Sequence, residues 1–524
     1  MRTLTATLLG SLLLASAWLN SLYAPAAEQA KVQLDKGKLP LSGQPPAKLT
    51  PDLCLLRYRI STDSPECQAF FDQGLAWLYS YVYGQAVQCF ETAVLRDPDC
   101  AMAWWGLSRA LFMDNKPALA QQALEKARAN QSQASHREQF LITALLQSKA
   151  PIPPKSTPEV QRAAAEKNRL AAIKTIDEML SLYDDDEEGW FFRAKLAGDA
   201  LAAVPFYKAL LRINALHPGG THELVHYYDS INRPALAWPY SENYIKGAPG
   251  IPHAYHMQVD HIALRLGRWD KVIERAPRAG ETDLLILALI HDGRFVEARK
   301  LGNRKSVNRF LLHVAERQWN DAREVLDALQ GGDALTVQYL TAVYHLKQEY
   351  SDLAAPSVEA LRKALQTPQD KNSKTDRNLL ENRQLETEGL LLCQQGDAKA
   401  GLTLLAKLGD RTKNAHRQMG WAHGAYFDEI RGTAALKTGQ DEIAEEALQH
   451  ALAHDSGSAR GALGMQILCE RQGRTKEAER FRDLARRIWE KADAGVLEAE
   501  LAYLRKPYPV KGSSQGAIEK PTGK

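Results

Sequence analysis

Small and aromatic residues recur along this chain at a spacing typical of paired helices. One set comprises Phe70, Gly74, Trp77, Ala86, Phe90, Ala93 and Pro98. A step of about 34 residues leads to a second set, Trp104, Ser108, Leu111, Ala120, Leu124 and Ala127. Because small side chains let two helices approach and aromatic ones fill the space between them, both sets predict antiparallel helix hairpins. Further along the chain, Ala444 and Ala478 repeat the same offset.

Turn residues mark more hairpins in the rest of the sequence. The turns are predicted at Gly267-Arg268-Trp269, Gly293-Arg294-Phe295, Gln318-Trp319, Gly396-Asp397, Gly439 and Gly473. Spacings of about 24–34 residues predict degenerate hairpins, some shorter than the standard tetratricopeptide (TPR) unit. Strand signals are almost absent. The expected fold class is therefore all-α, a TPR-like superhelical array of antiparallel helix hairpins, or α-solenoid.

Prolines, glycines and apolar runs divide the chain into segments. We expect a signal peptide over 1–26, a flexible lead-in over 27–52, N-terminal TPR repeats over 53–150, helical hairpins with a histidine-rich segment over 151–280, degenerate TPR-like repeats over 281–505 and a disordered tail over 506–524. The boundary at 150 rests on the prolines between Pro151 and Pro158, which interrupt the helical pattern.

The first residues have the order of a secretory signal peptide. Arg2 precedes an apolar core over Leu8–Leu19, and small residues follow at Ala24-Pro25-Ala26. We expect cleavage near Ala24 to Ala27. The alternative is an uncleaved anchor over Leu4–Tyr23, a stretch that polar residues interrupt. Cleavage would leave an exported protein, periplasmic or extracellular, without a stable membrane span.

The charge balance narrows the class of partner. The chain has 66 Lys and Arg residues against 63 Asp and Glu residues, a net charge of +3. Proteins that bind nucleic acid usually carry a strongly basic surface, so we expect no nucleic acid partner. A repeat array instead presents an extended groove, which suits a protein or peptide partner.

Six cysteines gain importance if the protein enters an oxidising compartment. Cys54 and Cys67 could close a short loop before the first helix. The alternative, small buried hydrophobic residues at helix contacts, suits Cys89, Cys393 and Cys469 better. No C-x-x-C motif is present, so thiol redox catalysis and a cysteine zinc ribbon both lack support in the sequence.

Histidines are concentrated in one stretch of the chain. Of 14 histidines, the stretch holds His217, His222, His226, His253, His256 and His261. Residues 222–226 have the form H-E-x-x-H, which places two imidazoles on one helical face beside a carboxylate. At 100° per residue, Asp229 shares this stripe with His222 and His226.

A second stripe lies on the helix expected over about 251–266. His253, His256 and Asp260 fall within about 60° of one another, and His261 lies about 80° from His253. Facing stripes would bring imidazoles and carboxylates together in numbers sufficient for one or two transition-metal ions, such as zinc. The leading interpretation is a structural hydrogen-bond network or pocket lining. The alternative is a metal site with ligands among His222, His226, Asp229, His253, His256, Asp260 and His261.

Several motifs together resemble those of exported bacterial TPR proteins with a His-rich central segment. They are His217-Pro218-Gly219-Gly220-Thr221-His222, His226-Tyr227-Tyr228-Asp229, Pro252-His253-Ala254-Tyr255-His256-Met257, His261-Ile262, Leu266-Gly267-Arg268-Trp269-Asp270, Cys67–Leu75 and Asp97–Gly106. The resemblance covers roughly Cys54 to Ala276 and implies helical repeats and protein interaction, with no established reaction. In that family the position of Glu223 is typically not acidic, which argues against a peptidase.

The sequence thus predicts an exported, non-enzymatic TPR scaffold that binds a protein or peptide and needs no cofactor. The alternative is a metal-binding protein or a zinc hydrolase built on residues 222–226. In the hydrolase, His222 and His226 would bind zinc and Glu223 would act as the general base. His256, His261 or Glu242 would complete the site.

Overall fold

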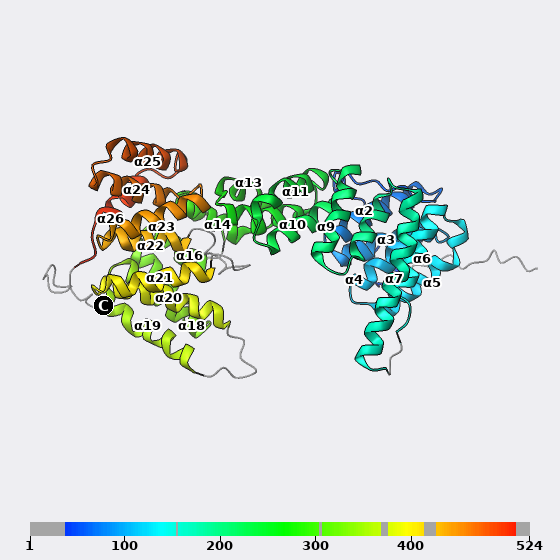
Figure 1. The fold of residues 1–524 in the computed structure, drawn as a ribbon, viewed down its shortest axis with the longest axis horizontal. Helices are drawn as coiled ribbons and strands as arrows, with labels where there is room; N and C mark the ends of the chain where they lie inside the picture. The colour runs from blue at the N-terminus through cyan, green and yellow to red at the C-terminus, as the bar shows by residue number, and fades with distance from the viewer. Residues whose placement is uncertain (1–36, 153–155, 303–305, 368–375, 413–425, 510–524) are drawn as a thin grey trace, which may run out of the picture. The chain divides into compact units, whose positions relative to one another are not determined.

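The computed structural model describes residues 37–152, 156–302, 306–367, 376–412 and 426–509. These residues form helices joined by turns and loops, with no β-strand among them. Consecutive helices lie side by side as hairpins (Figure 1), which confirms the predicted all-α array of helix pairs. The predicted signal peptide and residues 510–524 of the predicted tail lie outside the described residues.

The chain divides into two compact units, and the predicted boundaries at 150 and 280 fall inside them. Unit 1 is Met1–Pro51 with Arg57–Gly189, and unit 2 is Asp52–Leu56 with Trp190–Lys524. Unit 1 contains the hairpins α2/α3, α4/α5 and α6/α7. Its helices are α2 (Pro65–Tyr79), α3 (Tyr83–Arg96), α4 (Ala101–Met113), α5 (Pro117–Ala129), η1 (Gln131–Gln133), α6 (His136–Ser148) and α7 (Pro158–Leu182), and α8 (Glu187–Lys195) spans the boundary between the two ranges.

Unit 2 contains helices of more varied length, with a π turn and short 3-10 and α-helical segments among them. They are α9 (Ala200–Ile213), α10 (Pro218–Ser230), α11 (Pro234–Gly247), α12 (Pro252–Gln258), η2 (Val259–Ala263), η3 (Leu264–Leu266), α13 (Trp269–Ala279), α14 (Thr282–His291), α15 (Phe295–Ala298), α16 (Val307–Ala315), α17 (Trp319–Ala328), α18 (Ala334–Lys347), α19 (Ser351–Gln366), α20 (Arg377–Gln394), α21 (Ala398–Thr412), α22 (Tyr426–Lys437), α23 (Asp441–His454), α24 (Ala459–Arg471), α25 (Thr475–Ile488) and α26 (Val496–Arg505). None of the described helices combines the length and apolar character that a membrane crossing requires.

The first repeat shows why its small residues are needed. Phe90 of α3 is fully buried and lies against Gly74 of α2 and Gly106 of α4. A methyl group at Gly106 would come within 2.5 Å of the Phe90 ring, and one at Gly74 within 2.8 Å. The backbones of α2 and α4 therefore approach the ring as closely as they do because neither position carries a side chain.

Part of the lead-in, predicted to be flexible, packs on unit 1. Leu39 is 1% exposed, and the N–H groups of Leu41 and Ser42 donate to the carboxylate of Glu91 at 2.5 and 3.0 Å. The N–H of Ala47 donates to Thr92 at 2.9 Å. Acceptors on α3 thus hold three backbone N–H groups of this proline-rich stretch.

The predicted turns have the expected left-handed backbone. Positive φ angles occur at Gly267, Gly293, Gly396, Gly439 and Gly473, and at the turn before Trp319 the residue with this conformation is Arg317. Such a residue ends a helix and lets the chain reverse into the next one.

Within unit 2, α13 and α14 contact the residues that follow α23 and α25, so the array of helices from α13 to α26 is closed. Trp269 Nε1 donates to Asp455 Oδ2 at 3.0 Å, and Trp489 Nε1 donates to the carbonyl of His291 at 2.8 Å. The closed array surrounds a cavity of about 140 Å³, with walls from α14, α16, α18, α20, α22, α24 and α26. After α26, the N–H of Tyr508 donates to the carbonyl of Lys437 at 3.2 Å. The start of the predicted tail is therefore packed against the array.

Candidate metal centre

Helix α10 begins at a histidine that caps it. His217 is fully buried, and its Nδ1 accepts the N–H of Gly220 at 3.1 Å. Pro218 in the first turn has no N–H to satisfy and favours the helical backbone. The cap fixes the start of α10, so His222 and His226, four residues apart, lie on one face one turn and two turns further on.

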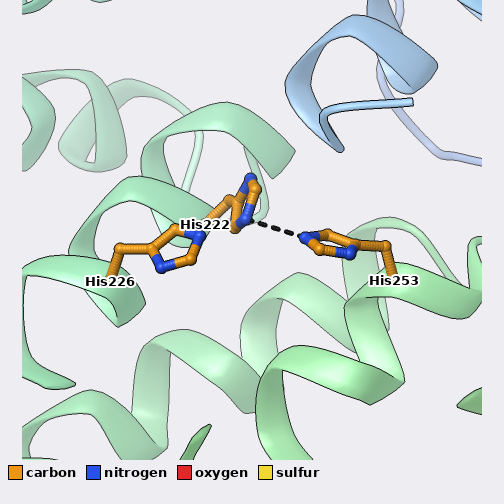
Figure 2. A group of neighbouring side chains, drawn as sticks. All are labelled: His222, His226 and His253. Carbon is orange, nitrogen blue, oxygen red and sulfur yellow. Dashed lines mark hydrogen bonds between the residues drawn. The ribbon is translucent and has the colours of Figure 1, made fainter. Parts of the chain in front are cut away.

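Three histidines from two helices converge beside this face. His222 and His226 belong to α10 and His253 to α12; we call them group A. Their ligand atoms all lie within 4.8 Å of one another. Figure 2 shows His253 pointing across from its helix toward His222, with the two Nε2 atoms 3.1 Å apart. His222 is fully buried and stacks on Tyr244 at 5.2 Å between ring centroids.

A second set of ligands lies next along the chain. His256 of α12 and Asp260 and His261 of η2 also place their ligand atoms within 4.8 Å of one another; we call them group B. Nδ1 of His256 is 2.7 Å from Glu281 Oε1, and Nδ1 of His261 is 2.9 Å from Asp229 Oδ2. A carboxylate on Nδ1 orients an imidazole and leaves its Nε2 for a metal ion.

A π-helical turn explains why this arrangement differs from the one predicted. Val259–Ala263 form a π turn, so the angles expected for a regular α-helix do not apply after Gln258. The stripe predicted from His253, His256 and Asp260 is split: His253 joins group A, and His261 joins His256 and Asp260. Single π turns inside helices are frequent at functional sites.

The two groups adjoin one another. The ring centroids of His226 and His261 are 5.3 Å apart, and those of His253 and His256 are 5.4 Å apart. The structure therefore brings together the stripes of α10 and α12 that the sequence analysis left as separate helix faces.

Burial and mutual repulsion favour the neutral state of His253. Burial, together with the neighbouring His256, His226 and His261, lowers the pKa of His253 to about 4. Burial alone would raise the pKa of Asp229, but the hydrogen bond to His261 and the charge of Arg265 outweigh it and leave the pKa lowered. A neutral imidazole is the form that binds metal ions, and an ionised carboxylate is the form that orients one.

Three acidic candidates do not join either group. Asp229 is ion-paired with Arg265 and bonded to His261. Glu223 pairs with Lys195 at 3.0 Å. Glu242 accepts hydrogen bonds from Gln258 and Arg275, each at 2.9 Å.

Sequence reasoning missed two residues that hold the site. Glu281 and Arg265 carry no motif, and their partners His256 and Asp229 are far away along the chain. It also missed the grouping of Cys67, Asp97 and Cys100 in unit 1, whose ligand atoms lie within 4.8 Å of one another. Only the packing of separate helices reveals these contacts.

Comparisons with known proteins assign no function to the chain. No family model matches the chain, and no curated protein matches it. Solved structures with a likeness include a human IFIT1 dimer with m7Gppp-AAAA, at 12% identity over 82% of this chain and 91% of that chain, with a TM-score of 0.26. Yeast Tom70 matches at 13% identity over 83% and 92%, with a TM-score of 0.24. The P58(IPK) TPR domain matches at 13% identity over 80% and 98%, with a TM-score of 0.20. TM-scores this low support no inference, so the fold class rests on the helices of this chain.

Proposed function

We propose that this protein is an exported, non-enzymatic helical-repeat scaffold that binds a transition-metal ion at group A, with group B as a second ligand set. The convergence of His222, His226 and His253 from two helices carries the proposal. Three imidazoles suit zinc and related ions. All three imidazoles place a ligand atom at the same point, so one ion would reach His222, His226 and His253 together.

Group B has the chemistry of a separate site. Two imidazoles and one carboxylate, from His256, His261 and Asp260, form a donor set used for iron and zinc. Glu281 and Asp229 orient the two rings. The proposal therefore allows one ion in each group.

The ion pair of Glu223 supports a non-enzymatic role for the site. A zinc hydrolase needs a carboxylate base beside the metal-bound water, and the Glu223 carboxylate pairs with Lys195 instead. We therefore assign the histidines a binding role and Glu223 no catalytic role.

The cavity of unit 2 supports a second proposed role for the scaffold, the binding of a protein or peptide partner. Its wall combines apolar side chains such as Leu287 and Leu390 with the charged side chains of Lys347, Glu429 and Arg460. Ligand pockets are typically apolar with a few placed polar groups, and a peptide segment offers both kinds of contact. Retention of a peptide partner by the full chain, lost on Leu390→Asp, would support this part.

Metal analysis of the mature chain, purified without a histidine tag and dialysed against Zn²⁺, tests the metal site. We expect up to two retained ions, one lost in His226→Ala and the other in His256→Ala. His454→Ala on the exposed end of α23 is the matched control and should retain the wild-type amount. Absence of retained zinc and of a Co²⁺ absorption band in the wild type would exclude the proposal. N-terminal sequencing of the purified protein tests export separately, with a start near Ala24 to Ala27 expected.

A further inference from the structure

Two cysteines lie together inside unit 1. Cys67 is in the first turn of α2, and Cys100 directly precedes α4 as its N-cap. They are 0% and 3% exposed, and their sulfur atoms are within 4.8 Å of each other. None of the six cysteines, all of which are described residues, is joined by a disulfide in the structure.

The position of Cys100 favours its thiolate. The hydrogen bond from Cys67 lowers the pKa of Cys100, burial opposes this effect, and the N–H of Ala103 adds to it. The N-terminus of a helix stabilises negative charge, so a cysteine there is more readily ionised. Cys100 is therefore the better nucleophile of the two.

A metal ion is a poorer explanation of this pair. The only carboxylate grouped with the two sulfurs in the described residues is Asp97, and it is already engaged. Its Oδ2 accepts from Thr62 Oγ1 at 2.5 Å, and its Oδ1 accepts from the N–H of Asp99 at 3.2 Å. Because the Asp97 carboxylate is engaged in this way, the group offers an ion only its two sulfur atoms.

We propose that Cys67 and Cys100 form a disulfide that joins the first helix hairpin to the second. The Cys100 thiolate attacks one sulfur of a disulfide oxidant and releases one thiol. The Cys67 thiol then loses its proton, attacks Cys100 Sγ, forms the S–S bond and releases the second thiol. Two electrons and two protons pass to the oxidant. Because both side chains are buried in the finished fold, the exchange precedes the final packing of α2 against α4.

This pairing differs from the one the sequence suggested, Cys54 with Cys67. The inference rests on the proposed export for the source of the oxidant in the cell. The pairing itself is tested on the purified full chain, where glutathione supplies the disulfide.

Peptide mapping identifies the bond directly. The full chain is refolded in oxidised and reduced glutathione, its thiols are blocked, and it is digested without reduction. Trypsin cleaves after Arg59, Arg96 and Arg109, so Cys67 and Cys100 fall into separate peptides, 60–96 and 97–109. We expect these peptides to be linked, with one blocking group on Cys89 and a mass otherwise two hydrogens below their sum, and to separate on reduction. Oxidation should raise the unfolding temperature of unit 1 by about 5 °C.

Cys89 shares the first peptide, so Cys89→Ala is the matched control. The link should survive in Cys89→Ala and disappear in Cys100→Ala, and the wild-type map decides the question if either variant fails to fold. A blocking group on Cys67 and on Cys100 in the oxidised wild type, or a link to Cys54, would overturn the pairing. A link that forms in glutathione but is missing from protein taken from cells supports the pairing and contradicts export.

Discussion

Asp229 shows how a residue outside a ligand group can govern it. Its carboxylate holds Nδ1 of His261 at 2.9 Å and is itself held by Arg265. Because carboxylates of this kind fix the orientation of a ligating imidazole, their loss usually weakens metal binding by about 10–100-fold. We expect Asp229→Asn to lower zinc affinity at group B by about this factor, measured by competition with a chelator.

Glu223 on the same helix provides the control for this prediction. It is also acidic, but it pairs with Lys195 and belongs to neither ligand group. Glu223→Gln should therefore leave zinc affinity unchanged. Equal losses in the two variants would indicate a general effect of charge on α10 rather than orientation of His261.

The candidate ligands were predictable from the sequence only where they share a helix. The four-residue spacing of His222 and His226 determines their common face on any α-helix. The π turn over Val259–Ala263 has no sequence signal, so the angles of a regular helix did not group His261 with His256 and Asp260. Glu281 holds His256 through a tertiary contact, and nothing local to either residue indicates it.

At the scale of the helix hairpin, Phe90 and its two glycines make a sharp test of packing. A side chain at Gly106 would meet the Phe90 ring at 2.5 Å. Overpacking of this kind typically costs about 1–3 kcal/mol, so Gly106→Ala should lower the free energy of unfolding by that amount. Urea denaturation followed by circular dichroism measures the loss.

Gly84→Ala is the matched substitution without a clash. Gly84 lies in the first turn of α3, the helix that carries Phe90, and no atom lies within 4 Å of a methyl group placed there. This variant should be more stable than the wild type by about 0.5 kcal/mol, since alanine restricts the unfolded chain. Adding Phe90→Leu to Gly106→Ala should recover part of the loss, and strict additivity would show that the two residues are not in contact.

The hairpins were predictable because their determinants are local. The repeated spacing of small and aromatic residues indicates which helices pair. The confirmed turns at Gly267 and Gly439 follow from the left-handed backbone that glycine allows. The packing of the lead-in was not predictable, because its partners, Glu91 and Thr92 of α3, carry no sequence pattern that marks them as acceptors for it.

For unit 2 as a whole, closure of the array is the feature that the repeats do not encode. Each repeat specifies its neighbours, whereas Trp269 and Asp455 meet across most of the unit. Gly267 permits this meeting, because a side chain there would collide with Asp455. The contact buries a carboxyl group, and that burial makes the closure measurable through pH.

The stability of unit 2 should fall with rising pH because of Asp455. Burial raises the pKa of Asp455 to about 7, although the hydrogen bond from Trp269 acts in the opposite direction. An aspartate in an unfolded chain ionises near pH ~4. Between these values the folded state binds more protons than the unfolded state, so the free energy of unfolding decreases as pH rises toward 7. At about 1.4 kcal/mol per pKa unit, the contribution amounts to a few kcal/mol.

Asp455→Asn removes the titration while keeping an oxygen acceptor for Trp269 Nε1. Urea denaturation at pH 5 and pH 8 should therefore show a smaller loss of stability in this variant than in the wild type. Asp352→Asn, at an exposed position on α19, should keep the wild-type loss. Equal losses in the wild type and Asp455→Asn would mean that Asp455 stays solvated in solution and that the closing contact with Trp269 is open. A smaller pH-dependent loss of stability in Asp455→Asn alone, with the wild-type loss kept in Asp352→Asn, would show that the array is closed in solution. In the closed array the cavity has all of its walls.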